Sequence, residues 1–322
     1  MHILLQALMA SLLLFANQAI AQSDYPSRPV TIVVPYSTGG TTDIVARILA
    51  QALNTATGKS FVVDNKGGAS GTIAMGFVAN AVPDGYTLLS NEMTQTIVPA
   101  LFPKLTFSPI RDLTSAGIFA EAPYVLAISS KVPVSNLKEF IAYCKANPGK
   151  VNFASGGSGS GPHMAGELLK SVAGIEMTHI PYKGSGPALQ DLLSGQVDVL
   201  ITAAPTVAQH LGSGRIKALA VASNKRVSTL PTVPTSSEAG LAAFVVANWF
   251  GLAAPKDTPQ KIIDQLNSEL VKTLAKPEFK EKLIAAGAEP VNISPADANK
   301  FIAAEGNRWG ELIRKAGIKA DN

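Results

Sequence analysis

Two glycine-rich loops contain the residues of this chain that are best suited to binding chemistry. The first loop, Ser37-Thr38-Gly39-Gly40-Thr41-Thr42-Asp43, follows a β-branched run and precedes a helical pattern. Glycine allows close backbone approach, and the first amides of a helix have no hydrogen-bond partner inside it. Together with the helix dipole, these amides can hold an anion. The simpler alternative is a tight turn in which Thr41 or Thr42 caps the helix. Asp43 is expected to pair with Arg47, four residues on, rather than to contact a ligand.

The second loop spans residues 154–163 and again links an expected strand to an expected helix. It contains an unbroken run of small residues, Ala, Ser and Gly, and the following helix opens at Pro162. Packing gives little reason for such a run, so we interpret it as a second anion cradle rather than a flexible surface loop. His163 either donates a hydrogen bond to a carboxylate or is a structural side chain.

Enzyme motifs are poorly represented. Ser158 and Ser160 lack the flanking glycines of G-x-S-x-G, and the Gly58-Lys59-Ser60 segment follows a helix with Leu53 where a P-loop needs glycine. The four His residues have no metal-ligand spacing. We therefore expect no enzyme, cofactor or metal site, and the alternative that stays open is an exported serine hydrolase using Ser160 and His163.

Composition points to a globular α/β protein. The chain has 322 residues, 47% of them hydrophobic and 16% charged, which is enough apolar material for two domains and too little charge for disorder. The net charge is only +4 and basic runs are absent, so nucleic-acid binding is not expected. The single cysteine, Cys144, cannot form an internal disulfide.

The N-terminus has the form of a secretory signal. An apolar run ends in Ala19-Ile20-Ala21 before Gln22, which predicts a signal peptide over residues 1–21 with cleavage after Ala21. No later apolar segment is long enough to span a membrane, so a soluble mature protein in the periplasm is expected. Export makes ATP and NAD improbable partners.

The mature chain alternates between strand and helix patterns. The expected strands cover residues 30–34, 61–64, 87–89, 124–129, 151–154, 176–180, 197–201 and 216–222. The expected helices cover 41–53, 73–81, 136–144 and 187–193, with one ending at Lys170 and two C-terminal helices beginning near Pro259 and Ser294. This order predicts mainly parallel sheets with helices on both faces. Ligands of such sheets bind at the carboxyl ends of the strands, where both loops lie.

The chain resembles the extracytoplasmic solute-binding receptors of tripartite tricarboxylate transporters, the Bug receptors, over nearly its whole mature length. The motifs that carry the resemblance are Tyr25-Pro26-Ser27-Arg28-Pro29, Gly39-Gly40-Thr41-Thr42-Asp43, Val63-Asp64-Asn65-Lys66, Pro83-Asp84-Gly85-Tyr86-Thr87, Asn147-Pro148-Gly149-Lys150, Pro181-Tyr182-Lys183-Gly184, Asp191-Leu192-Leu193-Ser194-Gly195, Leu230-Pro231-Thr232-Val233-Pro234 and Trp249-Phe250-Gly251-Leu252.

The resemblance implies a two-lobed α/β periplasmic-binding-protein (flytrap) fold that closes on its ligand. Lobe one would comprise residues 22–123 and 248–322, and lobe two residues 124–247. The ligand-binding residues that it implies are Tyr36, Ser37, Thr38, Gly39, Gly40, Thr41, Thr42, Asn91, Ser155, Gly157, Ser158, Gly159, Ser160, His163, Lys183, Thr202 and Trp249. A ligand carboxylate would be held by backbone amides and small hydroxyls.

Two features of the sequence bear on specificity: the residue pair at 201–202 and the aromatic residues Tyr36 and Trp249. Family members often have Phe-Asp where this chain has Ile201-Thr202, so a carboxylate that would face the cleft is missing. That loss argues against recognition of an amino group and suits a plain carboxylate, including an aromatic one. Tyr36 and Trp249 either stack on such a ring or only form walls of the cleft.

The resemblance implies a receptor that delivers a di-, tri- or aromatic carboxylate to membrane transporter subunits. We expect a monomer that binds and closes without covalent chemistry. A sensor that presents its closed form to a membrane signalling protein is a further alternative.

Overall fold

The computed structural model describes residues 25–182 and 184–319. Within them, the strands are β1 (Val30–Val34), β2 (Phe61–Asn65), β3 (Thr87–Glu92), β4 (Leu113–Ser129), β5 (Asn152–Ser155), β6 (Thr178–Pro181), β7 (Val199–Ala203), β8 (Ile216–Val221), β9 (Ala247–Pro255) and β10 (Glu289–Ile293). The helices are α2 (Thr41–Thr57), α3 (Thr72–Ala79), α4 (Thr94–Leu101), α5 (Leu137–Ala146), α6 (Gly161–Ala173), α7 (Ser185–Ser194), α8 (Ala204–Val207), α9 (Gln260–Leu274), α10 (Pro277–Ala285) and α11 (Pro295–Ala316), with the short 3₁₀ turns η1 (Ala69–Gly71) and η2 (Ala208–Ser213).

Strand β1 is buried on both faces, which explains its continuous run of apolar residues. Ile32 packs into the same core as Leu49 of α2. Its neighbour Val33 points to the opposite face and packs with Met75 of α3. Helices therefore cover both faces of this sheet, as the alternating pattern predicted, and the carboxyl end of β1 opens into the first glycine-rich loop.

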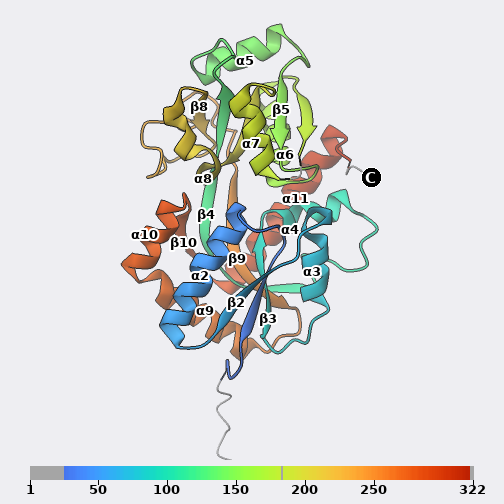
Figure 1. Ribbon diagram of the computed structural model, residues 1–322. Helices are drawn as coiled ribbons and strands as arrows, with labels where there is room; N and C mark the ends of the chain where they lie inside the picture. Colours follow the sequence, from blue (N-terminus) through green and yellow to red (C-terminus); the bar gives the residue numbers. More distant parts are fainter. Residues whose placement is uncertain (1–24, 183, 320–322) are drawn as a thin grey trace, which may run out of the picture.

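The long strand β4 passes from one lobe into the other (Figure 1). Its first part pairs antiparallel with β9 as far as Pro123, and from Tyr124 onward it pairs with β7 and β8. We propose this change of partner as the boundary between lobe one and lobe two.

Each lobe combines parallel and antiparallel strands. In lobe one, β1 lies parallel to β2 and β3, and in lobe two β5 lies parallel to β6 and β7. The crossing strands β4 and β9 join these groups through antiparallel pairs, so each sheet is mixed. The parallel strands bring the two glycine-rich loops to the carboxyl edges of their sheets.

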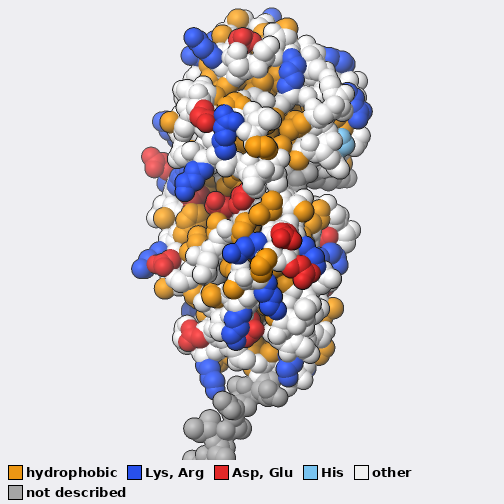
Figure 2. Space-filling view, turned by 90° about the vertical axis from the view of Figure 1, so that its left-hand side faces the viewer, with side chains coloured by type: hydrophobic (Ala, Val, Ile, Leu, Met, Phe, Trp, Pro, Cys, Tyr) orange, Lys and Arg blue, Asp and Glu red, His pale blue; other side chains and the backbone are white. Residues whose placement is uncertain are grey.

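Hydrogen bonds connect the two lobes. Ser228, in the loop after β8, donates from its backbone amide and its hydroxyl to Oε1 of Glu289 on β10, at 3.0 and 2.6 Å. Arg308 of α11 donates to the carbonyl of Val245 at 2.9 Å. Figure 2 shows the constriction between the lobes on one face, where acidic side chains gather.

Within the described residues, each helix is too short or too polar to cross a bilayer. The signal peptide expected over residues 1–21 lies outside the described residues.

Candidate functional site

Loop one begins at the carboxyl end of β1 and ends at the start of α2. Gly40 is the residue that caps α2, and no side chain provides the cap, so the expectation that Thr41 or Thr42 would do so is wrong. Gly39 has φ +86, a left-handed conformation that glycine adopts without strain. Residues 37–40 are exposed to solvent. The uncapped first turn of α2 thus leaves its backbone amides to be satisfied from outside the helix.

Asp43 holds loop one in shape. Its carboxylate accepts hydrogen bonds from the backbone amide of Gly39, from Arg47 Nε and from Asn65 Nδ2, each at 2.9 Å. Burial by itself would raise the pKa of Asp43, but these hydrogen bonds outweigh it and hold the pKa below its ordinary value. The predicted pairing with Arg47 is confirmed, and Asp43 also fixes the conformation of loop one by accepting the Gly39 amide.

Tyr36, the residue before loop one, reaches back to the end of β3. Its hydroxyl donates to Oε1 of Glu92 at 2.8 Å and lies 2.6 Å from the hydroxyl of Thr94. The backbone amide of Thr94 also donates to Glu92 Oε1, at 3.0 Å. Burial raises the pKa of Glu92, and burial together with the Glu92 charge raises that of Tyr36. A carboxyl group therefore lies directly behind loop one.

Loop two is held by its own small side chains. Ser160 caps α6 by accepting from the His163 amide at 3.4 Å, and its hydroxyl donates to the Gly157 carbonyl at 2.6 Å. The buried hydroxyl of Ser155 accepts from the Gly157 amide at 3.1 Å. Gly159 has φ +77 and forms the turn before the cap. These bonds use the serine hydroxyls to shape a loop that opens directly into the first turn of α6.

Two stacked imidazole rings support loop two. The His163 and His179 rings are nearly parallel, with centroids 3.8 Å apart and an interplanar angle of 4°. Nδ1 of His163 accepts the backbone amide of Gly159 at 3.0 Å, and Nε2 of His179 lies 2.6 Å from the hydroxyl of Ser155. His163 is only 5% exposed, so the geometry favours the structural role that the sequence left open.

The pair proposed for a hydrolase is not arranged as a nucleophile and a base. Ser160 Oγ donates to the Gly157 carbonyl, and the side of the His163 ring that faces the loop accepts the Gly159 amide. A general base must lie within hydrogen-bond reach of the proton that it removes. Each side chain has a partner in the loop backbone.

A third loop joins the first two. Gly67 lies so close to loop one that a Cβ atom there would sit 3.2 Å from the Ser37 amide nitrogen. Ser70, three residues on, donates to the Ser158 carbonyl of loop two at 3.1 Å. Ser70 has φ 54, an uncommon conformation for a non-glycine residue. This turn therefore contacts both loops at the candidate site.

Of the other residues predicted for the site, three are buried and one is not described. Asn91 is fully buried, and its amide donates to Gln95 at 2.9 Å. Thr202 is buried on β7 with its hydroxyl 3.3 Å from that of Thr206. Trp249 is buried on β9 and packs edge-on against Phe301 of α11. Lys183 lies outside the described residues.

Sequence reasoning missed Glu92 and Ser70. A weak signal existed for Glu92, because polar residues follow the apolar part of β3 at its carboxyl end, the edge where ligands bind. For Ser70 the sequence holds no such signal, since its partner Ser158 is distant in the chain.

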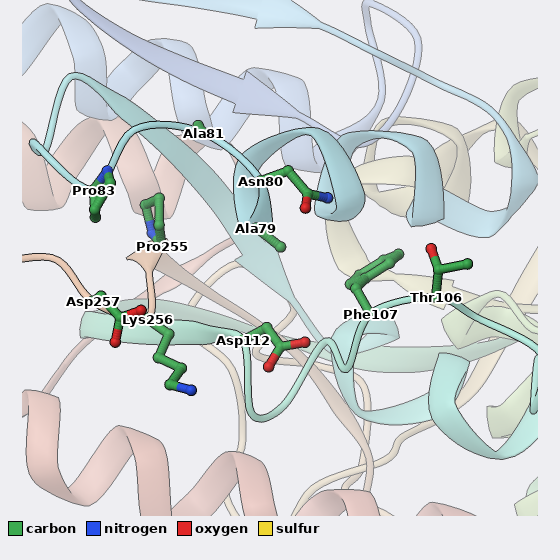
Figure 3. A pocket seen from close by; sticks show the side chains of 10 residues that line it. All are labelled: Ala79, Asn80, Ala81, Pro83, Thr106, Phe107, Asp112, Pro255, Lys256 and Asp257. Atoms are coloured by element: carbon green, nitrogen blue, oxygen red, sulfur yellow. The ribbon is translucent and has the colours of Figure 1, made fainter.

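One surface pocket lies away from these loops. A pocket of about 270 Å³ is lined by Ala81, Asp112, Lys256 and neighbouring residues (Figure 3). Ala81 precedes β3 and Lys256 follows β9, so the pocket lies at the amino end of β3, whereas Glu92 and loop one lie at its carboxyl end. It therefore belongs to the outer end of lobe one. In the part of the chain that the structure describes, no group of three or more acidic, His or Cys residues is placed to hold a metal ion.

Comparisons with known proteins agree with this architecture. Residues 45–318 match the model of the family described as "Tripartite tricarboxylate transporter family receptor". BugT of Bordetella pertussis is 39% identical over 302 residues, which cover 93% of each chain.

Solved structures of two bacterial proteins superimpose on this fold. A Rhodopseudomonas palustris protein, MatC, solved with malate superimposes with a TM-score of 0.81 at 34% identity, covering 90% of this chain and 100% of its own. Another R. palustris protein, solved with adipate, has a TM-score of 0.85 at 36% identity, covering 92% of this chain and 100% of its own. The chain therefore belongs to the tripartite tricarboxylate transporter receptor family, the periplasmic solute-binding receptors that include the Bug proteins.

Proposed function

We propose that this protein captures a small carboxylate between its two lobes and delivers it to a membrane transporter. The ligand carboxylate would lie between residues 36–42, which comprise Tyr36 and most of loop one, and residues 155–160 of loop two. There it would meet the uncapped backbone amides that open α2 and the Gly161 amide that opens α6. Residues 1–21 would direct export to the periplasm and be removed after Ala21.

One observation carries the proposal. Two glycine-rich loops, each leading into the first turn of a helix, come from different lobes. The third loop connects them, because its Gly67 lies against Ser37 and its Ser70 donates to the Ser158 carbonyl. The positive ends of two helix dipoles favour an anion at that place. A ligand held by both lobes favours the closed arrangement, because it contacts both only when they meet.

The chemistry of the loops suits reversible capture. Neither loop contains an arginine, so the donors are backbone amides and the hydroxyls of Ser and Thr. Neutral donors bind a carboxylate less tightly than a bidentate guanidinium does. That supports a receptor, which has to release its cargo. The malate and adipate in the solved relatives support a carboxylate ligand and, within the proposed class of di-, tri- and aromatic carboxylates, favour a dicarboxylate.

A thermal-shift screen of the mature chain, residues 22–322, tests the proposal. The panel contains citrate, succinate, malate, adipate, benzoate and terephthalate. A ligand that binds only the folded state raises the melting temperature in a saturable way. We expect such a rise with one structural class of carboxylate, with the compound recovered unchanged. No rise with any of them, or conversion of one into a product, would contradict the proposal.

A further inference from the structure

The two stacked imidazoles that support loop two respond differently to a proton. Nδ1 of His163 accepts the Gly159 amide at 3.0 Å, so the single proton of the neutral ring lies on Nε2. Both nitrogens of an imidazolium are donors, so a protonated His163 cannot accept that amide in any orientation of its ring. His179 differs, because its Nε2 lies 2.6 Å from the Ser155 hydroxyl, which can accept as well as donate. Protonation of His163 therefore breaks a hydrogen bond of loop two, whereas the contact of His179 with Ser155 fits either protonation state.

The aromatic surroundings of His163 add to the cost of a positive charge. The side chain is 5% exposed, and its ring centroid lies 3.8 Å from that of His179. The Phe153 ring stacks on the same pair, with its centroid 4.9 Å from that of His179 and 6.3 Å from that of His163. Burial among such rings disfavours the charged form of an imidazole, and a charge on one imidazole disfavours a charge on the other.

One acidic side chain faces Nε2 of His163. Glu167, one turn further along α6, has Oε1 3.9 Å from this nitrogen, and Lys170 donates to the same carboxylate at 3.0 Å. Nε2 carries a proton in both states of the ring, because the neutral ring already has its proton there. Glu167 can therefore orient the ring, but it does not replace the acceptor that the Gly159 amide loses.

Four further elements pack against α6. Three are the strands β5, β6 and β7, in which His179 is the one titratable residue. The fourth is α11, where Glu305 accepts from Trp309 and the other charged side chains are exposed, namely Asp297, Lys300, Arg308, Glu311, Arg314 and Lys315. Lys183, which follows β6 in the sequence, lies outside the described residues. Among all these groups, the Gly159 amide is the one whose hydrogen bond is lost when His163 is protonated.

Loss of this bond would act on ligand binding through the backbone of loop two. Gly159 forms the turn before Ser160, which caps α6, and the Gly161 amide that is proposed to meet the ligand follows directly. A ligand that has to order this turn itself binds less tightly. The binding arrangement thus requires the neutral ring of His163. Affinity should be full well above the ordinary histidine pKa of about 6.5 and should fall as the pH drops through that range.

We infer that His163 is a positioning residue that makes capture sensitive to protons, so that the receptor holds its carboxylate at neutral pH and releases it in mild acid. This inference rests on the proposed function, because it assumes that loop two contacts the ligand.

Isothermal titration of the mature chain with succinate, adipate and benzoate at pH 7.5, 6.5 and 5.5 tests the inference. For a carboxylate that binds, we expect Kd to rise about tenfold between the highest and the lowest pH, as the exclusion of one histidine proton predicts. Titration at pH 6.5 in two buffers of different ionisation enthalpy should show the release of about half a proton for each ligand bound.

His163→Asn separates this effect from the titration of the ligand itself. The amide oxygen of Asn can accept the Gly159 N–H and does not titrate in this range, so Kd at pH 7.5 and at pH 5.5 should agree within about twofold. His210→Asn is the matched control, because it removes an imidazole of η2, outside both loops. It should show the same rise in Kd as the unaltered chain.

Two results would overturn the inference while leaving the proposed function intact. One is a Kd of the unaltered chain that stays constant or becomes smaller in acid, as it would if an imidazolium simply attracted the anion. The other is an equal pH dependence in His163→Asn and in the unaltered chain. The pH profile and the proton release of the unaltered chain decide the matter if His163→Asn does not fold. If none of the carboxylates binds at any pH, the proposed function fails and the inference falls with it.

Discussion

At the scale of single residues, the side chains of the two loops mainly shape the backbone. Asp43 and His163 each accept a backbone amide of their own loop, and Ser160 caps the helix that follows. The first amides of α2 have no side-chain cap, whereas in the first turn of α6 Pro162 has no N–H and Ser160 accepts the His163 amide. Truncation of Asp43 or His163 would leave the amide donor of Gly39 or Gly159 without its acceptor. A donor that loses its partner away from water costs more than the bond was worth, so these residues should be sensitive to truncation.

Asp43→Asn should weaken the fold in a pH-dependent way. The pKa of Asp43 lies below its ordinary value of 3.8, so its ionised form stabilises the fold at neutral pH. That stabilisation is lost as the pH falls through the lowered pKa. We expect the free energy of unfolding of the variant to be lower by about 1–2 kcal/mol at neutral pH, with the two proteins converging in acid.

Urea unfolding near neutral pH and in acid measures this difference. Asp84→Asn is the control, because Asp84 forms an exposed ion pair with Arg28 that should contribute little. An equal deficit of Asp43→Asn at both pH values would contradict the account.

His163→Ala should weaken ligand binding more than it weakens folding. Without Nδ1 the Gly159 amide loses its acceptor, and loop two is no longer fixed at its turn. A lost hydrogen bond of this kind predicts about a tenfold rise in Kd. His163→Asn, which can offer an oxygen in a similar place, should recover part of the affinity. His210→Ala, on η2 and outside both loops, should leave Kd unchanged, and an equal loss in both alanine variants would contradict the role of His163.

At the scale of elements, the sequence predicted the strands and helices whose patterns are set by residues close together in the chain. Strand β1 was predicted with its observed bounds, because a β-branched run ends at Pro35. Helix α4 was missed, since Gln95 and its threonine neighbours are buried polar residues and Pro99 lies inside the helix, which hides any amphipathic pattern. The first half of β4 was missed as well, because residues far away in the chain, on β9 and β10, pair with it.

Gly161→Ala should disturb the start of α6. The added Cβ would lie 2.0 Å from the Tyr124 hydroxyl, so α6 or the crossing strand β4 has to move. Overpacking of this kind costs about 1–3 kcal/mol, and the first turn of α6 would shift away from the ligand. Thermal unfolding and Kd should both report the change. Gly161→Ala combined with Tyr124→Phe should recover part of the loss, since the phenol oxygen is the nearest obstacle.

Gly212→Ala is the matched control for this substitution. Gly212 lies in η2 with open space around the position of a Cβ atom. A comparable loss of stability in Gly212→Ala, or no loss in Gly161→Ala, would show that the contact with Tyr124 does not restrict this position.

At the scale of the whole molecule, the candidate site depends on contacts that sequence alone could not supply. The two loops were predicted from their glycines and from the strand-to-helix pattern on each side of them. Ser70 and Glu92 were not, because their partners Ser158 and Tyr36 come from distant parts of the chain. The contact of Trp249 with Phe301 of α11 could not be predicted either, because the two residues are distant in the chain.

Ser70→Ala should shift the balance between open and closed lobes. It removes a hydrogen bond between lobe one and lobe two, so the ligand has to supply more of the energy of closure. We expect Kd to rise by about three- to tenfold, with little change in the stability of the unliganded protein. Ser194→Ala removes a comparable bond inside lobe two, from its hydroxyl to the Asp191 carbonyl, and should change Kd little. Equal affinities of Ser70→Ala and the unaltered protein would show that this bridge does not contribute to closure.

The central claim is that two helix starts on opposite lobes hold the carboxylate of the ligand. Isothermal titration of the mature chain with succinate, adipate, 5-aminopentanoate and benzoate, each beside its neutral amide, tests it most directly. The account predicts one-to-one binding of at least one of these carboxylates, with its amide about 100-fold weaker or undetectable. An amide that binds as tightly as its carboxylate, or the absence of binding by all of them, would contradict it.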